Sequence, residues 1–175
     1  MGLPTLICKT FLGWRVSGGF PPEIKKCVVI VAPHTSWHDF FVGLFARKAV
    51  KTRIHWLGKK ELFVWPLNYY FKYTGGTPLD RTSGQNKVQS IAKIFESKEE
   101  FRLALAPEGT RKKVEKWRTG FYFIASEAKV PIIPVSFDYG PRVVTIGTPF
   151  YPTGDVEADI MELQSFYKGV EGKND

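Results

Sequence analysis

The stretch His34-Thr35-Ser36-Trp37-His38-Asp39 directly follows an apolar run at residues 27–32, and it decides how this part of the chain folds. In a continuous helix, five residues turn the chain by about 500°, which leaves the side chains of His34 and Asp39 roughly 140° apart. They can meet if His34 lies in a turn after a strand and Asp39 lies in the first turn of a helix. Pro33 disfavours helix in the residue before it, and Thr35 or Ser36 is a suitable N-cap. The sequence therefore predicts a strand, a turn carrying His34 and a helix carrying Asp39.

This pair of side chains has the chemistry of a general base. A histidine whose ring is held by a carboxylate can take a proton from a hydroxyl at neutral pH. With three histidines in the chain, chance gives about 0.1 such spacings, so the motif alone is weak. An alternative is a metal site, because His34 and His38 are four residues apart, as metal ligands on one helix face are. Cys8 and Cys27 lie elsewhere, so no third or fourth ligand is nearby and no metal is expected.

Length and composition indicate one domain over residues 1–175, with an ordinary globular balance of 43% hydrophobic and 24% charged residues. The aromatic content of 15% is high and fits broad apolar surfaces or a lipid-like ligand. A net charge of +8 favours anionic partners such as phosphorylated substrates, an anionic membrane or nucleic acid. Two cysteines without metal-type spacing indicate a reducing compartment.

The first 20 residues form a separate feature. Apolar side chains between Leu3 and Val16 recur near helical spacing with basic residues beside them, which predicts an amphipathic helix that ends at the Gly-Gly-Phe-Pro-Pro turn. This helix can lie in a membrane interface or dock on its own domain. No apolar run approaches the roughly 18–20 residues that span a bilayer, and no secretory signal is visible. We therefore expect a cytoplasmic protein, peripheral on the inner face of the membrane.

Strand and helix patterns alternate along the rest of the chain. Predicted strands cover Cys27–Ala32, Arg53–Leu57, Phe101–Ala106, Ile132–Phe137 and Val143–Ile146. Predicted helices cover Ser36–Val50, Asn86–Ser97, Gly120–Ala128 and Asp155–Lys168. Such alternation predicts an α/β fold, a single layered domain with a mostly parallel central sheet flanked by helices.

A second motif, Pro107-Glu108-Gly109-Thr110-Arg111, follows an apolar strand. Open α/β sheets bind ligands at the carboxyl ends of their strands. Gly109 permits close backbone approach, Thr110 offers a hydroxyl and an amide, and Arg111 can hold a phosphate with two hydrogen bonds. Ordinary turn chemistry with a solvated basic face explains this motif equally well when it is taken alone.

Two further motifs are individually ambiguous. The stretch Gly75-Gly76-Thr77-Pro78-Leu79-Asp80-Arg81 predicts a turn and a short extended piece, from which Arg81 can bind phosphate or pair with Asp80. The stretch Val130-Pro131-Ile132-Ile133-Pro134-Val135 is an apolar strand broken by two prolines. It is either a buried strand with an irregular edge or a wall of an acyl pocket, formed by Val130, Pro131 and Ile133.

Taken in order, the four motifs resemble the blocks of the glycerolipid acyltransferase family, the lysophosphatidate and glycerol-3-phosphate acyltransferases (PlsC-like). The resemblance runs from His34 to Val135. It implies acyl transfer from acyl-CoA or acyl carrier protein to the hydroxyl of a lysophosphatidate-like lipid at an anionic membrane surface, without a cofactor. It implies His34 as base and Asp39 as the group that orients it. By the same resemblance, Arg81 and Arg111 hold the acceptor phosphate in a pocket shaped by Glu108 and Gly109.

Some residues depart from the family pattern. Pro33 stands where the family often has Asn or Ser, and Lys112 stands where Ser is common. Thr77 and Pro78 replace larger apolar residues. These changes leave the acceptor open. A metal-dependent hydrolase and a non-catalytic module that binds anionic lipid are the alternatives, whereas no nucleic-acid motif is present.

Overall fold

Helices and strands alternate in the computed structural model, which describes residues 13–79, 87–110, 114 and 116–174. The strands are β1 (Arg15–Ser17), β2 (Lys26–Ala32), β3 (His55–Lys59), β4 (Gly76–Leu79), β5 (Phe101–Leu105), β6 (Ile132–Asp138) and β7 (Val143–Ile146). The helices are α1 (His38–Ala49), α2 (Leu67–Tyr73), α3 (Lys87–Ser97), α4 (Gly120–Ala128) and α5 (Val156–Ser165), with a 3₁₀ turn at Lys60–Leu62.

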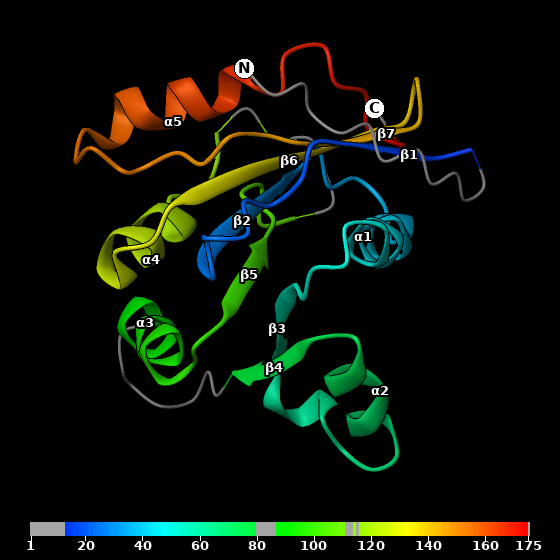
Figure 1. Cartoon of the computed structure of the whole chain (residues 1–175), viewed down its shortest axis with the longest axis vertical. Coiled ribbons are helices and arrows are strands. Elements are labelled where there is room, and N and C mark those ends of the chain that lie inside the picture. Colours follow the sequence, from blue (N-terminus) through cyan, green and yellow to red (C-terminus); the bar gives the residue numbers. More distant parts are fainter. Residues whose placement is uncertain (1–12, 80–86, 111–113, 115, 175) are drawn as a thin grey trace.

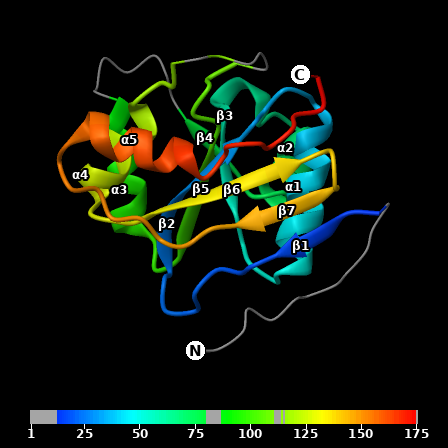
Figure 2. The ribbon, with the colours of Figure 1, turned by 90° about the horizontal axis from the view of Figure 1, so that it is seen from above.

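The strands form one sheet in the order β1-β7-β6-β2-β5-β3-β4 (Figure 1). Every neighbouring pair is parallel except β6 and β7. Helices α3, α4 and α5 gather on one side of the sheet, and α1 and α2 lie on the other (Figure 2). This arrangement confirms the expected α/β fold with a mostly parallel central sheet.

Strand β2 carries the core on both sides because successive side chains of a strand point to opposite faces. Val28 and Ile30 belong to the apolar cluster that includes residues of α3, α4 and α5. Cys27 and Val29 belong to the second cluster, together with residues of α1 and β7. A strand buried on both faces reads as a continuous apolar run, which is why β2 was predictable.

Tyr167 connects the two central strands. Its buried hydroxyl donates to the carbonyl of Ile30 in β2 at 2.9 Å and accepts from the N–H of Val135 in β6 at 3.2 Å. Burial raises the pKa of this phenol well above its usual value, so the hydroxyl stays protonated and can make both bonds. This bridge lies beside Pro134, the proline within β6.

The amino-terminal helix expected over residues 1–20 is wrong for its described part. Residues 13–17 form a turn and strand β1, which pairs with β7. Trp14 and Val16 are buried whereas Arg15 between them is exposed, which is the period of a strand and not of a helix. Residues 1–12 lie outside the described part of the chain.

Two local expectations also change. The N-cap of α1 is Trp37 and not Thr35 or Ser36, and no side chain caps it; Ser36 instead accepts a 3.3 Å hydrogen bond at Oγ from the N–H of His38. Helix α2 forms in an aromatic segment whose sequence shows no clear period. No helix in the described ranges has the length and apolar character needed to cross a bilayer.

Candidate active site

The site lies where three loops leave the same edge of the sheet. Strands β5 and β6 flank β2 and run parallel to it, so the loops that follow all three strands begin side by side. These loops carry His34, Glu108 and Tyr139. This edge is where open parallel sheets bind ligands, because the chain leaves β2 for one face and β5 for the other.

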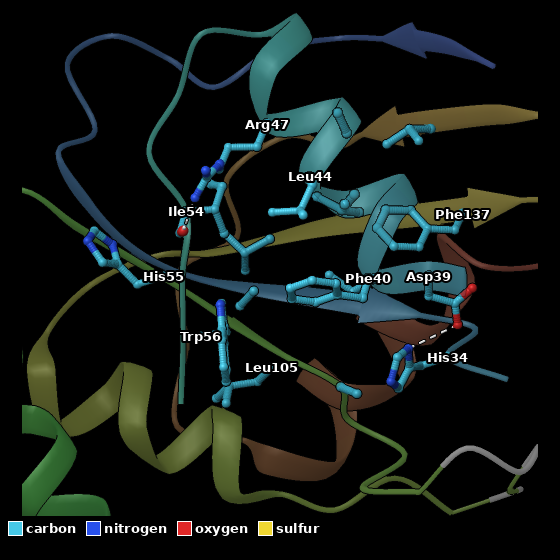
Figure 3. A pocket seen from close by; sticks show the side chains of 18 of the residues that line it. His34, Asp39, Phe40, Leu44, Arg47, Ile54, His55, Trp56, Leu105 and Phe137 are labelled. Carbon is cyan, nitrogen blue, oxygen red and sulfur yellow. Dashed lines mark hydrogen bonds and ion pairs between the residues drawn. The ribbon is translucent and has the colours of Figure 1, made fainter. Parts of the chain in front are cut away.

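His34 and Asp39 meet as the spacing predicted. His34 Nδ1 lies 3.0 Å from Oδ2 of Asp39 (Figure 3). The imidazole side chain is 27% exposed and the carboxylate is 1% exposed, so only the histidine is open to a ligand. A carboxylate that accepts from Nδ1–H leaves Nε2 as the proton acceptor, which is the tautomer a general base requires.

The Asp39 carboxylate is held by two further donors. The N–H of Ser36 donates to Oδ2 at 3.0 Å, and the hydroxyl of Tyr139 donates to Oδ1 at 2.6 Å. Burial alone raises the pKa of Asp39, but the hydrogen bonds from His34, Tyr139 and Ser36 outweigh it, so the pKa falls below the usual 3.8. Asp39 is therefore ionised and fixed at neutral pH, and it favours the imidazolium that forms when His34 takes a proton.

Tyr139 is a site residue that the sequence did not reveal. It stands in the turn after β6, where its ring packs edge-on against Trp14 at a centroid distance of 4.8 Å. Its backbone N–H donates to the carbonyl of Glu171 at 2.9 Å. Burial and the bond to Asp39 raise the pKa of the phenol well above 10, so it remains a donor. Its only sequence signal is its place just beyond a strand adjacent to β2.

Glu108 supports the histidine turn from the neighbouring strand. Its buried side chain accepts a 2.7 Å hydrogen bond at Oε2 from the backbone N–H of His34. The next residue, Gly109, has a φ of +65°, a left-handed backbone conformation that favours glycine, and a Cβ there would lie 2.6 Å from the Arg118 side chain, which would have to move. Thr110 is exposed. The sequence-predicted Arg81 and Arg111 lie outside the described residues.

His38 has partners of its own. Its Nδ1 lies 2.8 Å from Oγ of Ser36, and its ring stacks on Trp37 at a centroid distance of 3.9 Å. Within the described ranges, no three His, Cys, Asp or Glu side chains are grouped as ligands of one metal ion. The geometry therefore singles out His34, and not His38, as the partner of Asp39.

The turn after β2 is also held by the last residues of the chain. Thr35 Oγ1 accepts from the backbone N–H groups of Lys173 and Asn174 at 3.0 and 3.2 Å. The Asn174 side chain donates in turn to the Thr35 carbonyl at 2.9 Å. No spacing rule links positions so far apart in the sequence, so this contact was not predictable.

An apolar cavity of about 590 Å³ begins at the His34–Asp39 pair and runs between α1 and the sheet (Figure 3). At its far end lie Arg47, Ile54 and His55. Apolar side chains from β2, α1, β3, β5 and β6 form most of its wall, including Val31, Phe40, Leu44, Trp56, Ala104, Leu105, Val135 and Phe137.

The sequence-predicted acyl-pocket residues do not line this cavity. Val130 and Pro131 precede β6 and Ile133 lies near its start, whereas the cavity contacts Val135 and Phe137 farther along the strand. All three predicted residues are buried in the core instead. The apolar run correctly indicated burial, but it could not tell which end of the strand faces a cavity.

Two known proteins with similar sequences are named as acyltransferases. The chain is 29% identical over 124 residues to a 1-acyl-sn-glycerol-3-phosphate acyltransferase of Streptococcus pneumoniae, covering 70% of this chain and 46% of that protein. It is 25% identical over 162 residues to the human 1-acyl-sn-glycerol-3-phosphate acyltransferase beta, covering 88% and 57%. The chain thus spans about half the length of these two relatives.

The fold has a solved counterpart as well. The crystal structure of the 1-acyl-sn-glycerophosphate (LPA) acyltransferase PlsC from Thermotoga maritima matches with a TM-score of 0.58 at 19% identity, covering 90% of this chain and 73% of that one. At this identity the likeness shows the fold alone. The sequence model of the Acyltransferase family matches residues 16–138, which include both His34 and Asp39. The chain therefore belongs to the Acyltransferase family.

Proposed function

We propose that this protein transfers a fatty acyl group from a thioester donor to the free hydroxyl of a lysophosphatidate-like glycerol phosphate. The observation that carries the proposal is the His34–Asp39 pair at the mouth of an apolar cavity. The cavity suits an acyl chain, and the pair supplies a base next to the place where that chain would end.

In the proposed reaction, Nε2 of His34 takes the proton of the acceptor hydroxyl as its oxygen attacks the thioester carbonyl. A C–O bond forms, the C–S bond breaks, and the thiolate leaves with the proton returned from His34. Asp39 stabilises the imidazolium between these steps. General-base assistance of this kind contributes roughly 10²–10⁴-fold in rate.

The acyl chain is proposed to lie between α1 and the sheet, against Val31, Leu44 and Ala104. This assignment replaces the pocket expected from the sequence. These wall residues are apolar, so burial of each methylene of the acyl chain contributes about 0.8 kcal/mol to donor binding.

The phosphate end of the acceptor is assigned from the sequence and the family resemblance. Arg81 and Arg111 are proposed to hold the phosphate, since a planar guanidinium matches its oxygens in pairs. Glu108 is proposed to keep His34 in register with that pocket through the 2.7 Å bond to its backbone. Fixing the phosphate positions the hydroxyl against the base.

A direct assay tests this function. Purified protein is given radiolabelled acyl-CoA or acyl carrier protein with lysophosphatidate, glycerol 3-phosphate or an uncharged monoacylglycerol, and the His34→Ala variant serves as the control. We expect labelled product from lysophosphatidate with the wild type alone. Equal turnover of the uncharged acceptor would contradict the phosphate assignment, and equal turnover by the variant would contradict the base assignment. Comparing the two donors identifies the acyl carrier.

A further inference from the structure

Helix α2 and the turn before it expose a set of large aromatic side chains. Trp65 is 79% exposed, Tyr69 is 69% exposed and Tyr73 is 83% exposed. Tyr69 and Tyr73 each stand two residues from Phe71, which corresponds to about 200° around a helix and places them opposite it. Phe71 packs inward against Trp56 and the Phe63 ring. With Phe71 packed inward, Tyr69 and Tyr73 therefore face the solvent.

The helix is nevertheless held in a definite orientation. No residue of α2 is buried, so its own packing area is small. Arg47 of α1 donates from Nη1 to the carbonyl of Thr74, just after α2, at 2.8 Å, and Trp56 donates to the same carbonyl at 3.2 Å. These bonds fix the end of α2 against α1 and β3, on the side of the sheet away from α3, α4 and α5 (Figure 1).

A strongly cationic cleft of about 700 Å³ separates α2 from the end of α1. Five cationic side chains line it: Arg47, Lys48, Lys51, Arg53 and Lys72. Tyr70 and Tyr73 form part of its α2 wall. No Asp or Glu is among the described residues that line the cleft, so no carboxylate there balances this charge.

The cleft adjoins the apolar cavity that begins at His34. Five residues line both spaces: Leu44, Arg47, Ile54, His55 and Thr74. The exposed aromatic face, the cationic cleft and the far end of the cavity thus form one continuous region around α2.

We propose that this region is a docking surface for an anionic lipid bilayer, with the aromatic rings in the headgroup layer and the cleft on lipid phosphates. We name it the α2 surface, comprising Trp65, Tyr69, Tyr70, Tyr73, Lys48, Lys51, Arg53 and Lys72. Trp and Tyr favour the membrane–water interface because one end of each ring system is apolar and the other is polar. Cations beside them add attraction to anionic lipids, roughly fivefold in binding for each Lys or Arg.

This docking deepens the proposed function, because it sets the cavity end against the phase that holds a lipid substrate. A second protein is a poorer occupant, since the cleft concentrates one sign of charge beside a helix of only seven residues. A bilayer requires no matching shape, only a protruding aromatic face with positive charge around it.

Vesicle flotation of the protein tests the proposal. The probes are phosphatidylcholine vesicles with and without phosphatidylglycerol, at low and high salt. We expect binding to the anionic vesicles that weakens with salt. The Lys48→Glu/Lys51→Glu/Lys72→Glu variant should bind at least tenfold more weakly, and the Trp65→Ser/Tyr69→Ser/Tyr73→Ser variant should lose most of the salt-resistant binding.

Matched controls separate the α2 surface from net charge and total hydrophobicity. Lys25→Glu/Lys93→Glu/Lys168→Glu changes the net charge equally at exposed lysines away from α2. Phe123→Ser/Tyr151→Ser/Met161→Ser removes three exposed apolar side chains elsewhere. Both controls should bind as the wild type does. Equal weakening by a control and its matched test variant, or equal binding of the wild type to both vesicle types, would overturn the proposal.

Binding and turnover are read separately. With a short-chain lysophosphatidate dissolved as monomers, the lysine variant should keep wild-type kcat/KM, and with the same headgroup in vesicles it should lose at least tenfold. Loss on the monomeric acceptor as well would refute docking as the cause. Anionic vesicle binding that depends on the α2 surface without any acyl transfer would refute the proposed function and leave the docking intact.

Discussion

The turn that carries His34 and the helix α2 lie at opposite ends of one cavity, and they are stabilised in opposite ways. The turn is fixed from distant parts of the sequence, by Glu108, by Tyr139 through Asp39, and by Asn174 at Thr35. Helix α2 is anchored by one inward ring, Phe71, and by bonds to a backbone carbonyl at its end.

This difference fits the two tasks proposed for these regions. A general base must be held within a fraction of an ångström of its target. Its neighbours are therefore buried, and several of them hydrogen-bond to the same turn. A surface that meets a fluid partner needs exposure more than precision. The two ends of the cavity can therefore be distinguished by substitutions.

Replacing His34 should have the largest effect. His34→Ala removes the base, and kcat should fall by roughly 10²–10⁴-fold with the fold intact by circular dichroism. His38→Ala is the matched control, because that ring contacts Ser36 and Trp37 and not Asp39. It should keep most of the activity. Equal losses of activity in both variants would contradict the assignment of His34 as the base.

Filling the cavity tests whether its two ends are connected by the acyl chain. Ala104→Phe adds a ring to the wall formed by β5, and overpacking of this kind costs about 1–3 kcal/mol. We expect kcat/KM for a long-chain acyl donor to fall by roughly tenfold or more, with a much smaller change for a short-chain donor. Equal losses for the two donors, measured in parallel, would show that the acyl chain lies elsewhere.

Removing the hydroxyl of Tyr139 tests whether rigidity matters at the end of the cavity that carries His34. Tyr139→Phe deletes the 2.6 Å bond to Asp39, which should lower stability by about 1–2 kcal/mol and kcat several-fold. In an Asp39→Asn background the same change should cost less stability, and urea titrations of the four proteins measure that coupling. Tyr151→Phe, at an exposed position, is the control. Additive effects would deny that the phenol acts through the carboxylate.

The smallest effect concerns His55, near the α2 end. Burial, followed by the charge of Lys98, lowers the pKa of His55 from 6.5 to about 4, against an opposing hydrogen bond with the Arg102 backbone. The unfolded chain therefore binds a proton between pH 6.5 and about 4 that the folded protein does not, so stability falls as the pH drops through this window.

His55→Phe should flatten that dependence. As the pH falls from 6.5 to about 4, the wild type should lose about 1–2 kcal/mol of unfolding free energy relative to the variant, after allowance for partial exposure of the ring. Urea unfolding at stepped pH measures the difference. A constant difference across the window would show that His55 titrates alike in both states.

Local patterns predicted most of the sheet, because a strand buried on both faces is a continuous apolar run. Helix α3 was predictable because its apolar residues recur at helical spacing. The His34–Asp39 contact was predictable because both residues flank one turn. Tyr139 and Asn174 were not, since they reach the site only through the order of strands and the path of the chain's last residues. Strand β1 was mistaken for helix because its short apolar pattern is compatible with both periods. The residues expected to form an acyl pocket do not line the cavity for a related reason: hydrophobicity reports burial and not proximity to a cavity.

Helix α1 carries Asp39 in its first turn and Arg47 in its last, eight residues and about 12 Å apart along the axis. The carboxylate that orients His34 and the guanidinium that anchors the end of α2 thus belong to the same rigid helix. Neither group can move without the other. Inserting or deleting a residue between them would rotate one group by about 100° relative to the other. The length of this helix is therefore as much a part of the site's architecture as the residues it presents.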